Sequence, residues 1–327
     1  MCYKIETQKK NEEKLLLKLN ELAFPVYLRK YFTVRIESKA GALKYLIVIT
    51  DLLNWFIEER LIDKTSISEI EPSDFNNIIA EDITLYLKTK EQNGLSPTTL
   101  ETRKNIIRSF WNFLSRQNGT NIPEKFFLDV TYKGISCSNG LTKKLPMESQ
   151  IKNLEERLNW IRNDFIKNRN VAIFLVMQGT GIRESELAGL NFSDLHFDED
   201  MPYITVIGKG KYREAESRMV YLTETALKAL NDWIDYRKNL KIDIMDEEAV
   251  FISKYGKRII EADIYKFFKK YSNGELTPHM MRHWYASVVG NINTVFCQQQ
   301  LGHSNMTTTI NVYANGSVAM KDVLKNM

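Results

Sequence analysis

The stretch PYITVIGKGKYREAESRMVYL, Pro202 to Leu222, separates this chain from an all-helical protein. Pro202 to Ile207 and Arg218 to Leu222 alternate between apolar and polar residues, which is typical of β-strands with one buried face. The run between them, GKGKYRE at Gly208 to Glu214, is basic and carries two glycines suited to a turn. The stretch therefore predicts one β-hairpin.

The sequence around this hairpin has the spacing of α-helices. In the second half of the chain, we expect helices at Met147 to Lys167, Asn170 to Gln178, Thr223 to Leu240 and Glu261 to Tyr271. The segments around His279 and Thr307 are also predicted to be helical. A helical domain with a small sheet follows from this pattern.

The first half reads as helices, of which three can be placed. Ala42 to Arg60 is apolar on most faces, which indicates a buried helix, and Asp74 to Lys90 follows as an amphipathic one. EPSD, Glu71 to Asp74, marks the start of the second helix without settling which residue caps it. A third helix begins with Ser96 as N-cap and Pro97 at the first helical position. Its apolar face is formed by Leu100, Ile107, Trp111 and Leu114.

The length of 327 residues predicts two domains, because a single core of that size is unusual. The polar stretch Thr131 to Lys144 contains several glycines and serines and has the composition of a linker. We expect a helical N-terminal domain at residues 1–130, a linker at 131–146, and a second domain with a C-terminal tail at 147–327.

Composition favours a globular cytoplasmic protein. Hydrophobic residues make up 43% and charged residues 26% of the chain. The longest apolar run, Val171 to Met177, is too short to span a bilayer, and the N-terminus is charged where a secretory signal would be apolar. We therefore expect no membrane partner. Cys2, Cys137 and Cys297 are far apart and read as free thiols.

The net charge of +4 lies entirely in Met1 to Pro146, since the remainder holds equal numbers of acidic and basic residues. A basic front half favours nucleic acid binding, although many basic domains bind none. Arg103, Lys104 and Arg108 on the third helix are candidate DNA contacts. A solvated helix border is the alternative explanation for these three.

Four short segments carry the chemistry. They are TGIRESEL at Thr180 to Leu187, GKGKYRE, TPHMMRHWYA at Thr277 to Ala286, and LGHSNMTTTINVYA at Leu301 to Ala314. Together and in this order they resemble the tyrosine recombinase, or phage integrase, family. The resemblance covers Met147 to Tyr313. It implies a two-domain architecture that is mainly α with a small β-sheet or hairpin, in which a helical core-binding domain precedes a mixed α/β catalytic domain.

The resemblance also assigns roles to individual residues. The catalytic set it implies is Arg183, Lys209, His279, Arg282, His303 and Tyr313, with Glu186 in support. Arginine suits the two guanidinium positions because attack on a phosphodiester builds negative charge on the nonbridging oxygens. A surface ion pair is the alternative for Arg183, because Glu184 and Glu186 are close in sequence. Within the family pattern, Glu186 orients and does not attack.

Proton transfer involves the histidines and a lysine. A tyrosine hydroxyl has a pKa of about 10, so Tyr313 needs a base as it attacks phosphorus. His279 is the candidate base, and His303 is a candidate donor to the phosphate. Tyr313 lies ten residues beyond His303, whereas many family members place the tyrosine one residue closer. His196 and His283 are expected to be ordinary core or surface histidines without a catalytic role.

Lys209 corresponds to the hairpin lysine of the family, which protonates the departing 5′ oxygen. Lys211 is the alternative for that role and a candidate DNA contact. The turn is not a phosphate-binding P-loop, because Tyr212 follows where Ser or Thr is needed. The pair His279 and His283 lacks the glutamate of a zinc motif, since Met280 occupies its place. We therefore expect no cofactor and no metal.

The implied activity is site-specific recombination of double-stranded DNA through a 3′-phosphotyrosyl intermediate. The family's chemistry requires no ATP, and it implies a tetramer on two duplexes, with an accessory DNA-bending or directionality factor as a further partner. Integration, excision, transposition and resolution all stay open as outcomes. The tail, Ser317 to Met327, is expected to pack on a neighbouring protomer. A type IB topoisomerase and a catalytically silent DNA-binding regulator are the alternatives.

Overall fold

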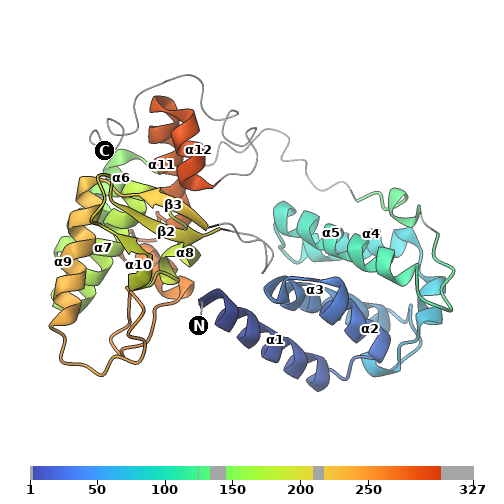
Figure 1. Cartoon of the computed structure of the whole chain (residues 1–327). Helices are drawn as coiled ribbons and strands as arrows, with labels where there is room; N and C mark the ends of the chain where they lie inside the picture. Colours follow the sequence, from blue (N-terminus) through green and yellow to red (C-terminus); the bar gives the residue numbers. More distant parts are fainter. Residues whose placement is uncertain (1–2, 124, 133–144, 209–216, 303–327) are drawn as a thin grey trace. The chain divides into compact units, whose positions relative to one another are not determined.

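The computed structural model describes residues 3–123, 125–132, 145–208 and 217–302, and the chain forms two compact units, Met1–Gly140 and Leu141–Met327 (Figure 1). Most of the predicted linker, most of the hairpin turn and the helical segment predicted around Thr307 lie outside the described residues. The assignment of separate roles to two domains stays a prediction.

Unit 1 is built from helices in its described part. They are α1 (Tyr3–Glu21), α2 (Val26–Lys30), a π-helical turn (Tyr31–Arg35), α3 (Lys39–Glu58), the 3-10 turns Ile67–Glu69 and Pro72–Asn77, α4 (Ala80–Gln92), α5 (Pro97–Leu114) and a last 3-10 turn at Phe126–Leu128. The helix α1 was not predicted. Its sequence is mostly charged and polar, so its apolar residues gave too weak a periodic signal. Two of them, Leu15 and Leu19, are nevertheless buried.

The helix α3 is the buried helix predicted from Ala42 to Arg60. It begins after Ser38, whose Oγ accepts a hydrogen bond from the Gly41 N–H at 3.2 Å. By length and composition alone α3 could cross a membrane. It packs against α1 and α5, however, and Leu46, Leu52 and Phe56 belong to the core of unit 1. We therefore interpret α3 as a core helix.

The third predicted helix is confirmed as α5. Ser96 Oγ accepts a hydrogen bond from the Thr99 N–H at 3.3 Å, and Pro97 occupies the first helical position. The predicted apolar face is buried, and Trp111 on it stacks on Phe126 with ring centroids 5.5 Å apart. This face supplies much of the aromatic core of unit 1.

The prediction of one helix from Asp74 to Lys90 is wrong. A 3-10 turn covers Pro72–Asn77, Ile78 and Ile79 are extended, and α4 begins only at Ala80. Asp82 Oδ2 accepts a hydrogen bond from the Ile79 N–H at 2.9 Å, which starts a new helix there. A helical spacing of apolar residues runs across this break and conceals it.

Unit 2 contains α6 (Glu148–Asn159), α7 (Asp164–Thr180), α8 (Glu184–Ala188), a 3-10 turn at Phe192–Asp194, α9 (Glu224–Lys238), α10 (Glu261–Tyr271), α11 (Pro278–Ile292) and α12 (Thr294–Leu301). The helix predicted from Met147 to Lys167 is interrupted. Asn163 Oδ1 accepts a hydrogen bond from the Ile166 N–H at 2.9 Å and thereby caps α7 as a separate helix.

The predicted hairpin is confirmed in its two strands. β2 (Tyr203–Ile207) pairs antiparallel with β3 (Ser217–Tyr221), with Ile204 opposite Val220, and a short β1 (Leu195–His196) completes a three-stranded sheet in the order β1-β2-β3. The strand β1 was not predicted because two residues carry no periodic signal. The fold class, mainly α with a small sheet, is confirmed.

Helix packing in unit 2 brings separate parts of the sequence together. α7 packs against α9 and α11, and α12 packs against both α11 and β3 (Figure 1). The end of α7, the start of α8, the strand β3 and the end of α12 consequently meet in one region. The candidate site lies there.

Candidate active site

The turn between α7 and α8 places Arg183. Gly181 ends α7 in the left-handed conformation, with φ of 63°, and its N–H donates to the Met177 carbonyl at 3.0 Å. Thr180 Oγ1 accepts a hydrogen bond from the Ile182 N–H at 3.2 Å. The chain therefore reverses within a short turn, and Arg183 becomes the residue before α8.

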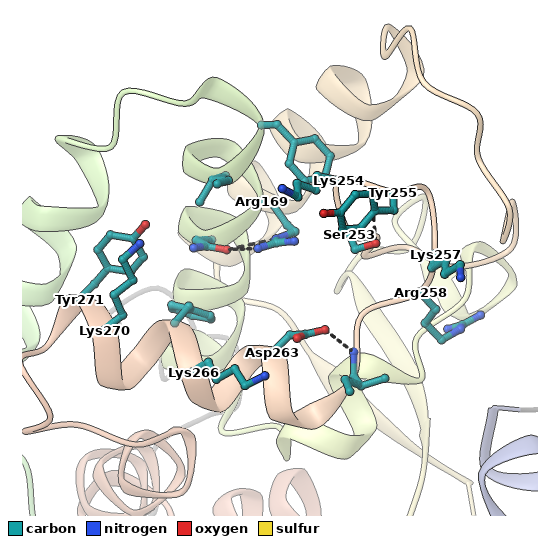
Figure 2. Close-up of a pocket in the computed structure, with 15 residues that line it drawn as sticks. Arg169, Ser253, Lys254, Tyr255, Lys257, Arg258, Asp263, Lys266, Lys270 and Tyr271 are labelled. Carbon is teal, nitrogen blue, oxygen red and sulfur yellow. Dashed lines mark hydrogen bonds between the residues drawn. The ribbon is translucent and has the colours of Figure 1, made fainter. Parts of the chain in front are cut away.

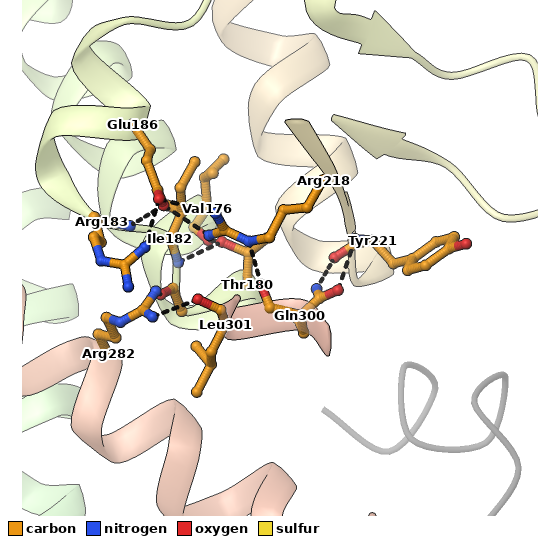
Figure 3. Close-up of polar contacts among 11 residues, drawn as sticks. Val176, Thr180, Ile182, Arg183, Glu186, Arg218, Tyr221, Arg282, Gln300 and Leu301 are labelled. Atoms are coloured by element: carbon orange, nitrogen blue, oxygen red, sulfur yellow. Dashed lines mark hydrogen bonds and ion pairs between the residues drawn. The ribbon is translucent and has the colours of Figure 1, made fainter. Parts of the chain in front are cut away.

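Glu186 is the centre of the site (Figure 3). Its carboxylate accepts hydrogen bonds from the Arg183 N–H at 3.0 Å and from Arg183 Nη1 at 2.6 Å. The guanidinium of Arg218 binds the same carboxylate through two parallel bonds, Nη1 to Oε1 at 2.9 Å and Nη2 to Oε2 at 2.8 Å. The Glu186 side chain is only 2% exposed, so two arginines share one buried carboxylate.

These contacts keep Glu186 ionised. Burial by itself raises the pKa of Glu186, but the hydrogen bonds and positive charge of Arg218, together with the Arg183 N–H, outweigh it and lower the pKa to about 2. A carboxylate that stays charged at neutral pH can hold both guanidiniums in fixed positions.

Arg282 reaches the same region from α11. Its Nη1 donates to the Gly181 carbonyl at 2.8 Å and its Nη2 to the Leu301 carbonyl at 2.6 Å. Burial, and then the positive charge of Arg183, lower the pKa of Arg282 to about 9, which leaves it protonated at neutral pH. Arg183 and Arg218 thus bind one carboxylate, and Arg282 lies near enough for its charge to interact with Arg183 and Glu186. The excess of positive charge favours an anionic ligand.

Among the predicted histidines, only His279 and His283 belong to the same described helix as Arg282. Their ring centroids lie 4.4 Å apart in an edge-to-face arrangement. His279 is exposed and precedes Arg282 by one helical turn. His196 stacks on Tyr203 with centroids 4.5 Å apart, and its Nε2 lies 3.1 Å from Thr205 Oγ1.

Four predicted site residues, Lys209, Lys211, His303 and Tyr313, lie outside the described residues. Their neighbours in the chain are placed, however. Gly208 follows β2, and Gly302 ends α12 in the left-handed conformation. The structure therefore brings Arg183, Glu186 and Arg282 together, and the roles of the whole predicted set remain proposals.

The three predicted DNA contacts on α5 differ in their surroundings. Arg103 Nη1 lies 2.5 Å from Asp51 Oδ2 in a cluster that includes Tyr86, and Lys104 Nζ donates to the Tyr132 carbonyl at 2.8 Å. Arg108 is exposed and lies over the Phe127 ring at 5.6 Å. Arg103 and Lys104 consequently have internal partners, and DNA contact by all three stays a prediction.

Sequence reasoning missed two residues of the site, Arg218 and Gln300. Arg218 looks like an ordinary polar position of an alternating strand, and Gln300 like a surface glutamine at the end of a helix. Gln300 is 1% exposed, and both residues contact groups that are distant in sequence. No local pattern could have revealed them.

A second concave region of unit 2 lies between α7, α10 and the loop before α10 (Figure 2). The cavity has a volume of about 520 Å³, and a single acidic residue, Asp263, lines it. Its basic lining residues are Arg169, Lys254, Lys257, Arg258, Lys266 and Lys270. Arg169 Nη1 donates to the Ile252 carbonyl at 3.2 Å, which anchors it inside the cavity.

Within residues 3–123, 125–132, 145–208 and 217–302, histidine, cysteine, aspartate and glutamate form no group of three that could hold a metal ion. Cys297 is buried, and burial raises the pKa of its thiol to about 12.

Comparisons with known proteins agree on one family. The model of the phage integrase family matches residues 148–319. Tyrosine recombinase XerC of Salmonella typhi is 31% identical over 227 residues, which cover 67% of this chain and 69% of that protein. XerC of Caldanaerobacter subterraneus subsp. tengcongensis is 29% identical over 282 residues, covering 81% of this chain and 73% of that protein.

Solved structures share the fold. XerH site-specific recombinase bound to palindromic difH substrate matches with a TM-score of 0.64 and 19% identity, covering 88% of this chain and 78% of that one. A lambda integrase dimer bound to a COC′ core site matches with a TM-score of 0.62 and 12% identity, covering 90% and 98%.

Proposed function

The chain belongs to the phage integrase family and is a tyrosine recombinase, and we propose that it cuts and rejoins DNA at a specific site through a covalent bond to Tyr313. The observation that carries this proposal is the meeting of Arg183 and Arg282 beside Glu186, from helices about a hundred residues apart in sequence. Two fixed guanidiniums can stabilise the charge that develops on the nonbridging oxygens of a phosphodiester.

The guanidiniums retain donors for that task. Each arginine has five N–H donors, and Arg183 uses one of them on Glu186 while Arg282 uses two on main-chain carbonyls. The internal bonds fix the planes of both groups before substrate arrives. Stabilisation of the transition state then requires little rearrangement.

The proposed reaction consists of two transesterifications. The Tyr313 oxygen attacks phosphorus and loses its proton to His279, the bond from phosphorus to the 5′ oxygen breaks, and Lys209 protonates that oxygen. A 3′-phosphotyrosyl bond and a free 5′ hydroxyl result. The 5′ hydroxyl of a partner strand then attacks the phosphotyrosyl phosphorus and gives its proton to Lys209. The bond from phosphorus to the Tyr313 oxygen breaks, His279 returns the proton to that oxygen, and the DNA is resealed, with His303 donating to the phosphate throughout.

Contact with double-stranded DNA is proposed for both parts of the chain. Residues 1–130 would act as the core-binding domain through Arg108 and its neighbours, residues 131–146 as the linker, and residues 147–327 as the catalytic domain. The basic lining of the cavity beside α10 supports phosphate contacts from unit 2, and Lys211 would add another. XerH and lambda integrase were solved bound to DNA, which supports the same partner here.

The proposed assembly is a tetramer on two duplexes in the cytoplasm. Strand exchange requires four active sites, because each of four strands is cut once. Whether the outcome is integration, excision, transposition or resolution depends on the arrangement of sites and on accessory factors. Sedimentation of the protein mixed with one duplex, and of the protein mixed with two duplexes, measures the number of protomers in each complex and so tests the predicted tetramer.

Covalent trapping tests the proposed function. A duplex that the purified protein selects from a random-sequence pool is nicked close to the cleavage point, so that the short fragment carrying the 5′ hydroxyl diffuses away. The wild-type protein should then give a slowly migrating protein–DNA band on a denaturing gel. Tyr313→Phe should bind the duplex without giving the band, and the exposed control Tyr265→Phe should give it.

The same gel separates this proposal from two alternatives. Absence of the band with wild-type protein that binds DNA would support a silent regulator. Relaxation of a supercoiled plasmid that lacks the selected site would support a topoisomerase activity instead.

A further inference from the structure

A set of hydrogen bonds fastens the strand β3 to the end of α12. The side-chain amide of Gln300 pairs with the main chain of Tyr221, whose N–H donates to Gln300 Oε1 at 3.0 Å and whose carbonyl accepts from Gln300 Nε2 at 2.6 Å. β3 is the last strand of the sheet order, so this amide occupies the place of a neighbouring strand. Gln300 is buried, which makes both bonds costly to lose.

Arg218 connects these hydrogen-bonded residues to Glu186. Its Nε donates to the Gln300 carbonyl at 3.0 Å, while its two terminal nitrogens bind the Glu186 carboxylate (Figure 3). The Arg218 side chain is 13% exposed, and these bonds hold it both at Nε and at its two terminal nitrogens. One guanidinium thus joins β3, α8 and α12, which no lysine could do with a single ammonium group.

The C-terminal end of α12 packs directly against the Arg218 side chain at Gly302. A Cβ at Gly302 would lie 2.9 Å from Arg218 Cδ and 3.0 Å from its Nε. The left-handed φ of 63° ends the helix at this point. The next residue in the sequence is His303, and Tyr313 follows ten residues later.

We propose that Arg218 and Gln300 are positioning residues that set both sides of the active site at once, an inference that rests on the proposed function. Through Glu186, Arg218 fixes Arg183, which faces the phosphate. Through the end of α12, Arg218 and Gln300 fix the point from which the chain continues to His303 and Tyr313. β3, the strand that follows the turn containing Lys209, carries Arg218 and Tyr221 and therefore belongs to the same group of hydrogen-bonded residues.

This role has a kinetic signature. Misplacing a reacting group by about 1 Å costs on the order of 100-fold in rate, because the attack requires close alignment of the oxygen and phosphorus. Neither Arg218 nor Gln300 needs to contact DNA for this effect. Their loss should therefore lower the rate of covalent-bond formation and leave the affinity for DNA nearly unchanged.

The experiment measures both quantities on the nicked duplex. Single-turnover formation of the phosphotyrosyl product gives the rate constant. For the dissociation constant, each variant is combined with Tyr313→Phe, so that no covalent bond forms, and is titrated against the duplex. The variants are Arg218→Met, Arg218→Lys and Gln300→Met. The controls are Gln299→Met, an exposed neighbour on α12, and Arg162→Met, an exposed arginine of unit 2. Thermal melting shows which variants are folded at the assay temperature.

We expect Arg218→Met and Gln300→Met to reduce the rate constant about 100-fold, with dissociation constants within threefold of wild type. Arg218→Lys should recover part of the rate, and both controls should match wild type. Because Gln300 does not touch Glu186, Gln300→Met keeps the test valid if Arg218→Met fails to fold.

Two results would overturn the inference, and they are distinguishable. Wild-type rate constants in folded Arg218→Met or Gln300→Met would refute the positioning role alone. Absence of covalent product from the wild-type protein would refute the proposed function and this inference with it.

Discussion

Arg282 Nη1 donates a hydrogen bond at 2.8 Å to the carbonyl oxygen of Gly181, a residue 101 positions earlier in the chain. The bond joins α11 to the turn that carries Arg183. The turn at Gly181 therefore positions two arginines from distant segments, Arg183 and Arg282. Substituting Gly181 tests the contribution of this turn.

Replacing Gly181 by alanine should destabilise the protein more than the backbone conformation alone explains. The left-handed conformation costs about 1–2 kcal/mol for a residue with a Cβ. The added Cβ would also lie 2.6 Å from Tyr285 Cδ1 and 2.8 Å from Leu301 Cδ2, which adds about 1–3 kcal/mol of overpacking. Urea unfolding measures the total.

Gly274 provides the matched control, because its φ is +83° and an added Cβ would meet nothing within 4 Å. Gly274→Ala should show the backbone cost only. Equal losses of stability in the two variants would contradict the packing account at Gly181.

Replacing Arg282 by lysine should reduce cleavage by about 10²–10³-fold while the protein still binds DNA. Lysine keeps a charge, but one ammonium group cannot satisfy the Gly181 and Leu301 carbonyls and also present donors to a phosphate. Single-turnover cleavage of the nicked duplex measures the loss. The exposed control Arg162→Lys should cleave at the wild-type rate, and wild-type cleavage by Arg282→Lys would show that the fork geometry is dispensable.

Glu186→Gln should cost roughly 3–5 kcal/mol of stability at neutral pH, because it leaves Arg183 and Arg218 without their shared carboxylate. Denaturant unfolding at pH 7 measures this loss. Glu184→Gln, on the same short helix, is the control and should lie close to wild type.

The same carboxylate gives the protein a predictable dependence of stability on pH. The pKa of Glu186 is lowered to about 2 in the folded chain, from its ordinary value of 4.5. The unfolded state therefore binds the proton more readily, so the stabilisation is complete above pH 4.5 and is lost as the pH falls toward 2. Between pH 5 and 3, wild type should lose more stability than Glu186→Gln, and parallel pH profiles would argue against this assignment.

The role of Lys209 as the acid can be separated from simple DNA contact. If the 5′ bridging oxygen of the scissile phosphate is replaced by sulfur, the leaving group is a thiolate, whose pKa of about 8.5 removes the need for a proton. Lys209→Ala should slow cleavage of the oxygen substrate by about 10²–10⁴-fold and cleave the sulfur substrate at nearly the wild-type rate.

Lys211→Ala is the control for that experiment. It should weaken DNA binding in a salt-dependent way and affect both substrates alike. A defect in Lys209→Ala that is equal on the two substrates would assign the acid to another residue.

Local sequence signals predicted the parts of the fold that depend on neighbours in the chain. Ser96 and Pro97 mark the start of α5, and the alternation around Val206 and Val220 marks the hairpin, because caps and strand faces are set within a few residues. The same logic failed at Asn163 and Ile79, where helix starts interrupt a periodic apolar pattern. Periodicity reports a buried face and does not show whether the helix beneath it is continuous.

The candidate site divides in a similar way. Arg183, Glu186 and Arg282 could be named because they stand in motifs that resemble a known family. Arg218 and Gln300 could not, because their importance comes from contacts with Glu186 and Tyr221 that only the folded chain creates.

The identity of the DNA-linked residue is the most direct test of this account. The covalent product from the nicked duplex is digested with protease and nuclease, and mass spectrometry locates the tyrosine that carries the nucleotide remnant. We predict a single adduct at Tyr313, lost in Tyr313→Phe and retained in Tyr265→Phe. An adduct on any other residue, or its persistence in Tyr313→Phe, would contradict the central claim.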